Sequence, residues 1–222
     1  MKKIIEEFSR KLSAYESAKD SLYIKAVNSG RCKEKLSSCC FEICADIALV
    51  LYLKSDSSSP EFYSALVPPK IITSWSVDRT QVWNQALLNS LLLFPPRYYS
   101  LINMFTVPGY EGENFMDPAE FQGFTDLHHG ICISNTNKSF GASAIFLPGV
   151  AKRISQLLHG SYYIAFTSLH EAMVHPAELA DPCAMQEVIR MMIYDNEIKP
   201  DDLLSVHIFQ YDPVTDRIRP VL

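Results

Sequence analysis

Two short polar segments in the second half of the chain carry residue types that could do chemistry. Residues 135–139 read NTNKS, and consecutive backbone N–H groups of such a turn, with its lysine, can hold an anion. Residues 167–171 read TSLHE and follow a strand-like segment, where sites tend to form. Both segments are equally explained as an ordinary turn and a strand corner. The candidate polar site is Asn135, Lys138, Ser139, Ser168, His170 and Glu171.

The histidines and cysteines do not form a metal-binding pattern. His170 and His175 are five residues apart, whereas the zinc-protease motif needs two histidines four apart on one helical face. His128 and His129 are adjacent and need a third ligand from elsewhere, so chance occurrence explains them better. We expect a structural hydrogen bond between Glu171 and His175 and no metal. The six cysteines lack paired C-x-x-C spacing and are expected to be small buried thiols.

The familiar catalytic and nucleotide-binding signatures are absent from the sequence. It contains no G-x-S-x-G nucleophile elbow, no P-loop and no G-x-G-x-x-G turn. We therefore expect no cofactor. Two classes of function remain open: a protein that acts by binding, and an enzyme of unrecognised type in which the two polar segments converge. A third, weaker alternative is a metal protein that uses His128, His129 and a distant carboxylate.

Composition and charge exclude several further classes. With 222 residues, 48% of them hydrophobic and 20% charged, the chain can bury a proper core. The net charge of −5 and the lack of a basic cluster make nucleic-acid binding unexpected. The longest apolar run, residues 43–53, is too short to span a membrane. The start MKKIIEEF turns acidic before any apolar run, unlike an export signal, so we expect a cytoplasmic protein with reduced thiols.

The elements that must position the polar segments lie within residues 131–176. Residues 131–134 and 142–147 are apolar and flank the NTNKS turn, which predicts a β-hairpin. Apolar residues then recur at helical spacing from Pro148 to Leu158, and Gly160 is placed to end that helix. Residues 162–166 predict a returning strand. We expect a sheet with the helix after Pro148 covering one face.

The rest of the chain completes an α+β pattern. We expect an N-terminal amphipathic helix within residues 1–20, docked on the body or on a partner. Strands are predicted at 22–27, 43–53, 62–67, 206–211 and 217–221, and helices at 31–42, 70–75, after the cap Asp78, at 97–104 and at 184–196. The sheet is mixed or largely antiparallel and built from hairpins. Residues 21–222 form a single domain, or two lobes, 21–106 and 131–222, joined by an irregular loop 107–130.

Several sequence blocks together resemble one protein family. They are DIALVLY at 46–52, WSV at 75–77 with Asn89, SN…GA…PGV within 134–150, and YYI…SLHE within 162–171. In this order the blocks resemble an uncharacterised domain-of-unknown-function family from anaerobic Gram-positive gut bacteria. The resemblance implies a cytosolic bacterial protein carried on mobile elements, and it supplies no catalytic residues.

These observations favour a non-enzymatic cytosolic protein that binds another protein, such as an accessory or inhibitor protein of a mobile element. We expect neither nucleic acid nor a membrane as its partner. The alternative is an enzyme with its polar site at the 135–139 turn and the 167–171 corner.

Overall fold

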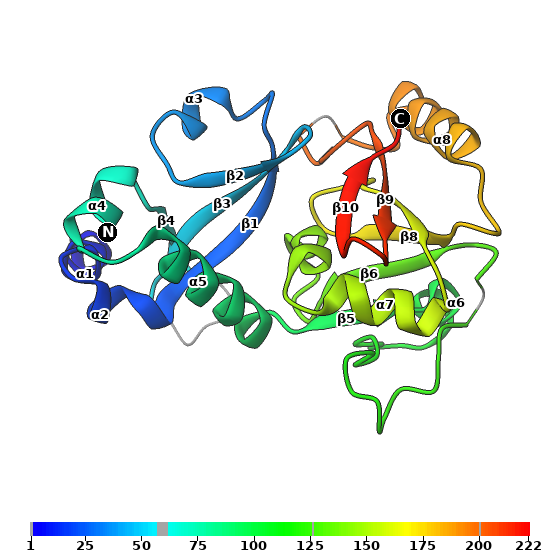
Figure 1. Cartoon of the computed structure of the whole chain (residues 1–222), viewed down its shortest axis with the longest axis horizontal. Coiled ribbons are helices and arrows are strands. Elements are labelled where there is room, and N and C mark those ends of the chain that lie inside the picture. The colour runs from blue at the N-terminus through cyan, green and yellow to red at the C-terminus, as the bar shows by residue number, and fades with distance from the viewer. Residues whose placement is uncertain (1, 57–61, 126, 200) are drawn as a thin grey trace.

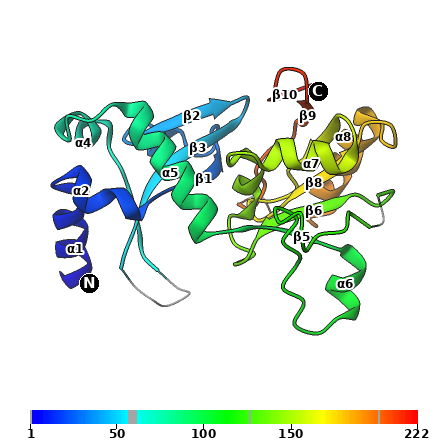
Figure 2. The same cartoon turned by 60° about the horizontal axis from the view of Figure 1, so that its bottom comes forward.

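The computed structural model describes residues 2–56, 62–125, 127–199 and 201–222. Its described elements form two antiparallel sheets with helices packed on them, which confirms the predicted α+β class. The two sheets lie side by side along the long axis of the molecule (Figure 1). The chain passes from one sheet to the other between α5 (Arg79–Leu93) and β5 (Pro96–Tyr99) (Figure 2). The chain therefore crosses between the two sheets before the 107–130 loop begins.

The N-terminal sheet is built around β3 (Ile47–Lys54), which is buried along nearly its whole length. β1 (Leu22–Asn28) and β2 (Phe41–Cys44) flank it, and β4 (Ser64–Leu66) pairs with one end of β3. The single strand predicted over 43–53 is wrong, because a two-residue turn with Ala45 at φ 54° folds this segment into a hairpin. An unbroken apolar run does not reveal a tight reversal, since both arms bury similar side chains.

The N-terminal helices pack against this sheet. They are α1 (Lys2–Leu12), α2 (Tyr15–Ala18), the 3-10 helix η1 (Lys19–Ser21), α3 (Lys33–Leu36), α4 (Pro69–Ser74) and α5. The predicted N-terminal helix is shorter and interrupted, and of the helix predicted over 31–42 only α3 forms. α1 docks on its own chain, because Lys11 Nζ donates to Lys54 O at 2.9 Å and Trp75 Nε1 donates to Leu12 O at 2.9 Å.

Helix α5 begins at the predicted cap and crosses β1. The Asp78 side chain accepts from Thr80 N at 2.7 Å. Near the other end of the helix, Ser90 Oγ accepts from Ile24 N at 2.9 Å and Asn89 Nδ2 donates to Leu22 O at 2.8 Å. These buried polar bonds fix β1 relative to α5.

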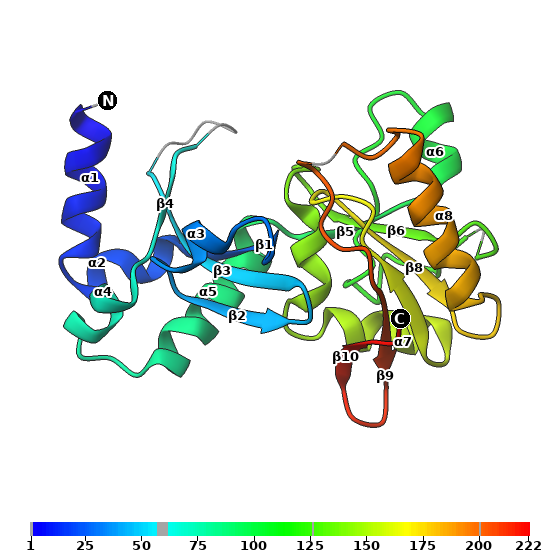
Figure 3. The same ribbon diagram turned by 90° about the horizontal axis from the view of Figure 1, so that it is seen from above.

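The C-terminal sheet has the strand order β10-β9-β7-β8-β6-β5, and every neighbouring pair is antiparallel. Its remaining strands are β6 (Ile131–Asn135), β7 (Tyr162–Ala165), β8 (Ala172–Pro176), β9 (Ile208–Asp212) and β10 (Arg217–Pro220). The helix predicted over 97–104 is wrong, because β5 occupies its first part and α6 (Leu101–Thr106) starts only after the Ser100 cap. Figure 3 shows this sheet beside the N-terminal one, seen from above.

The hairpin predicted from 131–134 and 142–147 does not form. β6 does, but residues 141–146 are the 3-10 helix η2 (Gly141–Phe146), and the strand that pairs with β6 on this side is β8. Phe140, at φ 52°, turns the chain away from the sheet, and the small buried residues that follow pack close to β6. Apolar small residues suit a buried 3-10 turn as well as a strand, so their composition misled the prediction.

Two helices cover opposite faces of the C-terminal sheet. α7 (Val150–Leu158) packs on the face of Tyr162 and Ile164, and Tyr162 OH donates to Ala151 O at 3.0 Å, which confirms the predicted covering helix. The residue that ends α7 in the left-handed conformation is His159 (φ 57°), not Gly160. α8 (Pro182–Tyr194) packs on the face of Ala165, the other side of β7.

The described residues of the 107–130 loop contain no helix or strand, yet the loop is anchored to β5. The Tyr98 and Glu113 backbones exchange hydrogen bonds of 3.0 and 2.8 Å, and Phe115 and Phe121 are buried beside Tyr98. Across the parts of the chain that the structure describes, no helix has the length and apolar character needed to cross a membrane.

Candidate functional site

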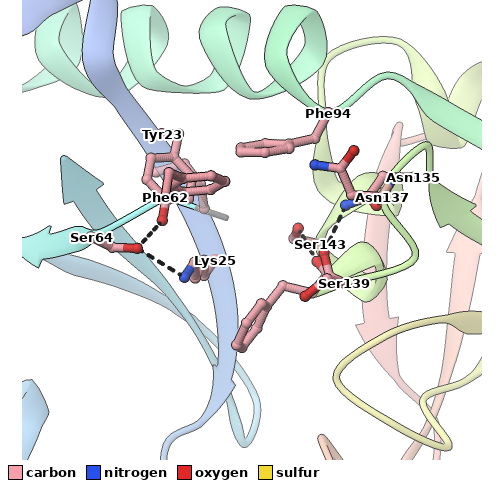
Figure 4. Close-up of a pocket in the computed structure, with 11 residues that line it drawn as sticks. Tyr23, Lys25, Phe62, Ser64, Phe94, Asn135, Asn137, Ser139 and Ser143 are labelled. Atoms are coloured by element: carbon pink, nitrogen blue, oxygen red, sulfur yellow. Dashed lines mark hydrogen bonds between the residues drawn. The ribbon is translucent and has the colours of Figure 1, made fainter. Parts of the chain in front are cut away.

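A cleft of about 450 Å³ lies where the two sheets face each other (Figure 4). β1 and Ser64 of β4 form its N-terminal wall, with Phe62 and Phe94 beside them. The turn that follows β6 and the start of η2 form its C-terminal wall. The site therefore exists only because segments more than 100 residues apart in the sequence meet across it.

Lys25 is the cation of this cleft. Its Nζ lies 4.3 Å from the centroid of the Phe140 ring, 4.9 Å from that of Tyr52 and 3.3 Å from Ser64 Oγ. The described residues that line the cleft include no aspartate or glutamate. Burial, with a smaller contribution from the charge of Lys35, lowers the pKa of Lys25 to about 8. The aromatic faces compensate its charge only in part.

The N-terminal wall is aromatic. The Phe62 and Phe94 rings stack with centroids 5.7 Å apart, and the Phe94 ring lies 5.3 Å from that of Tyr23. Tyr23 OH donates to Ser64 Oγ at 2.8 Å, and burial raises the pKa of the Tyr23 phenol. This wall can pack against a planar or apolar group.

The C-terminal wall is polar and held in shape by its own hydrogen bonds. The Asn135 side chain accepts from Asn137 N at 3.0 Å and donates to Ser139 O at 2.9 Å. Ser143 Oγ donates to Phe140 O at 2.7 Å, which holds the left-handed Phe140 that places its ring over Lys25. The exposed Asn137 and Ser139 side chains keep donors and acceptors for a ligand.

The six residues predicted from the sequence lie in three places. Asn135 and Ser139 line the cleft, whereas Lys138 faces the other side of the turn, where its Nζ donates to Tyr110 O at 2.9 Å. The 167–171 corner packs behind the turn: Ser134 Oγ donates to His170 O at 2.6 Å and Phe140 N donates to His170 Nδ1 at 3.3 Å. The residues on either side of the 135–139 segment thus contact the corner at His170, but Ser168, His170 and Glu171 do not line the cleft.

The hydrogen bond predicted between Glu171 and His175 is wrong. Glu171 Oε1 instead accepts from Thr167 Oγ1 at 3.2 Å and from Ser168 Oγ. His175 is packed against Gly130, and burial lowers its pKa. Both side chains line a separate, methionine-rich groove of about 550 Å³ beneath α8. Over the residues that the structure describes, no three His, Cys, Asp or Glu side chains gather to hold a metal ion.

Sequence reasoning missed the residue at the centre of the cleft, although a signal for it exists. Lys25 is the one charged residue in the apolar strand sequence LYIKAVN. A charged residue in such a strand lies either at a sheet edge or in a binding site, because lysine is seldom fully buried without a partner. Phe94 and Phe140 give no such signal. They belong to different elements: the packing of α5 on β1 brings Phe94 to the cleft, and the meeting of the two sheets brings Phe140 to Lys25.

Comparison with known proteins gives one match. Residues 2–213 match the family model described as a family of unknown function, DUF5688. No curated protein and no solved structure matches the chain.

Proposed function

The chain belongs to DUF5688, a family of unknown function, and we propose that it binds a small anion with an apolar body in the cleft between its two sheets. The observation that supports the proposal is Lys25, a half-buried ammonium that faces this cleft with no acidic residue among the described lining. We take the ligand class to be carboxylates that carry an aromatic or aliphatic group.

Charge complementarity supports an anionic ligand. A buried cation without a counter-ion is unfavourable, and a bound carboxylate would give Lys25 the counter-ion that the described lining of the cleft does not supply. An ammonium-to-carboxylate hydrogen bond in a partly dehydrated site is also stronger than one in water.

The shape of the cleft supports the apolar part of the ligand. Its volume lies in the range of small-molecule sites. The rings of Tyr23, Phe62 and Phe94 offer one wall for stacking, while Asn137 and Ser139 face it with polar groups (Figure 4). A planar carboxylate could therefore pack between the walls with its charged end at Lys25.

The protonation of Lys25 gives the proposal a pH signature. Protonated Lys25 attracts an anion and neutral Lys25 does not. Because the pKa of Lys25 is about 8, this change of charge takes place in a pH range in which binding can be measured. Affinity should be highest below pH 8 and should fall as the pH rises through it. Binding should also be accompanied by proton uptake at pH 8, because the anion favours the charged amine.

Calorimetric titration with benzoate and, separately, benzyl alcohol tests this function. We expect benzoate to bind and the neutral alcohol to bind at least about tenfold more weakly, because only benzoate can pair with Lys25. Lys25→Met should remove the difference, while Lys70→Met, an exposed lysine outside the cleft, should preserve it. Equal binding of both probes, or binding of benzoate that Lys25→Met leaves intact, would contradict the proposal.

Protein binding, the first expectation from the sequence, stays a prediction, as do the bacterial origin and the cytoplasmic location. α6 and α8 carry exposed apolar side chains, among them Phe105 (89% exposed) and Tyr194 (84%), but nothing in the described structure indicates what would cover them. Size-exclusion chromatography with light scattering would show whether the purified chain self-associates.

A further inference from the structure

A second pocket, of about 650 Å³, opens on the other side of the 135–139 turn. Its walls are this turn, Arg97 of β5, the end of α6 and the segment 107–111 that follows α6. It shares no lining residue with the cleft. Successive residues of the turn separate the two sites: Asn137 and Ser139 face the cleft, and Thr136 and Lys138 face the second pocket.

Arg97 has a charge that the described residues leave uncompensated. It lies on the edge strand β5, where its backbone pairs with Ser134 of β6. Its side chain is half-buried, and Nη1 is fully buried without a hydrogen-bond partner. None of the ion pairs found within the described ranges includes Arg97. A buried, unpaired guanidinium nitrogen is costly, and native proteins leave few such groups without a reason.

Lys138 brings a second cation to the same pocket. The residue is held in the left-handed conformation (φ 52°), and its Nζ donates to Tyr110 O at 2.9 Å, 5.0 Å from the centroid of the Tyr99 ring. An ammonium has three donors, so two remain after this contact. Thr136 adds an exposed hydroxyl group at the rim. Glu111 also lines the pocket, but no ion pair within the described residues joins it to either cation.

We propose that this pocket binds a phosphate group, with Arg97 and Lys138 as its two cationic partners and the Thr136 hydroxyl as a further donor. A doubly charged oxyanion matches two cations better than a carboxylate does, and the planar guanidinium can bind two of its oxygens at once. The apolar side chains of Met104, Phe105 and Val107 border the pocket, so an organic phosphate ester gains contacts that inorganic phosphate lacks.

An NMR titration of the full chain with inorganic phosphate, at ionic strength held constant with chloride, tests the site. Saturable amide shifts should appear at 109–111 and 136–138, and phenyl phosphate should produce the same shifts at lower concentration. Arg97→Gln and Lys138→Gln should each weaken binding about tenfold, since each removes one charge-assisted contact. Arg97→Lys, which retains the charge without the planar fork, should fall between these variants and the wild type. Arg190→Gln and Lys70→Gln, at exposed positions outside the pocket, are the matched controls.

A thermal melt without phosphate separates this role from a structural one. Arg97→Gln should unfold at the same temperature as the wild type or higher, because it removes an uncompensated charge, whereas phosphate should raise the melting temperature of the wild type more than that of Arg97→Gln. Phosphate shifts that occur elsewhere, no saturable shifts, or unchanged phosphate binding by Arg97→Gln would each overturn the proposal. The benzoate titration of the cleft is independent of all three results, because the two sites share no lining residue.

Discussion

The two sides of the 135–139 turn place a lysine in opposite surroundings. In the cleft, Lys25 is half-buried between the Tyr52 and Phe140 rings and has Ser64 Oγ, 3.3 Å away, as its hydrogen-bond partner. In the second pocket, Lys138 is exposed and donates to the Tyr110 carbonyl oxygen at 2.9 Å. The 135–139 turn thus separates an aromatic site with a single cation from a site with two.

The difference shows how the residues around a cation determine which anions it can bind. Burial among aromatic rings lowers the pKa of Lys25 to about 8, so its charge can be switched by a ligand or by pH. Arg97, in contrast, carries a planar guanidinium, which can bind two oxygen atoms of an anion at once, whereas the Lys25 ammonium acts as a point charge. Variants at the turn and in each site test whether the two sites bind anions independently.

The largest effect is expected at Gly141, which supports both sites. A Cβ atom at this position would overlap Ser134 Oγ and lie 2.5 Å from His170 O. Gly141→Ala should therefore destabilise the protein by about 2–3 kcal/mol in urea unfolding, and it should weaken both benzoate and phosphate binding. Gly160→Ala is the control, because nothing lies within 4 Å of its Cβ position, and it should change stability little. If Gly141→Ala were as stable as the wild type, the close packing of Gly141 against Ser134 and His170 would not be needed to support the turn.

Lys25→Met should separate the two sites. We expect benzoate affinity to fall by about tenfold or more, because the only cation of the described cleft lining is lost, while phosphate binding stays unchanged. Calorimetric titrations with the two anions measure both effects. A parallel loss of phosphate binding would show that the sites are not separate.

The same variant has a pH-dependent effect on stability. The lowered pKa means that between about pH 8 and the ordinary lysine pKa the unfolded chain binds more protons than the folded one. The free energy of unfolding of the wild type, measured relative to Lys25→Met, should therefore rise across this interval. Urea unfolding at pH 7, 8, 9 and 10 gives the comparison, and a flat difference would mean that Lys25 titrates normally.

Phe140→Leu should have a smaller effect that is confined to the cleft. It retains an apolar side chain but removes the aromatic face that lies 4.3 Å from Lys25 Nζ. The cation–π contribution is about 0.5–1 kcal/mol, so we expect benzoate affinity to change by about two- to fivefold. Phosphate binding in the same preparation serves as the internal control. A change in phosphate affinity of the same size would point to a general disturbance of the turn.

The smallest effect is expected from Tyr110→Phe at the rim of the second pocket. The variant loses the bond from Tyr110 OH to Glu113 Oε1 at 2.9 Å and the one from Ser100 N at 3.3 Å. A loss of about 0.5–1 kcal/mol in urea unfolding follows, because the Glu113 bond is exposed to solvent. Since Lys138 contacts the Tyr110 backbone and not the hydroxyl, phosphate binding should stay within about twofold of the wild type.

Local residue patterns were sufficient to predict much of the architecture. The strand β1, the Asp78 cap of α5 and the apolar spacing in α7 each depend on residues within one element, so the sequence predicts them correctly. Two of the errors lie in apolar segments beside chain reversals: residues 43–53 contain the turn at Ala45, and residues 142–147, which follow the polar turn after β6, belong largely to η2. There, the same side chains suit a strand, a hairpin arm or a 3-10 turn, and packing decides between them.

The two candidate sites likewise combine features that the sequence predicts with features that depend on packing. The residue types alone indicate that residues 135–139 form a polar turn and that LYIKAVN contains a lone lysine in an apolar strand. The folded chain is needed to show that this lysine faces that turn, and that Arg97 and Lys138 line one pocket on its other side. Side-chain burial and charge pairing depend on contacts between segments that are distant in the sequence. The pKa of a lysine is therefore lowered, or the charge of an arginine left uncompensated, only when the whole chain has folded around it.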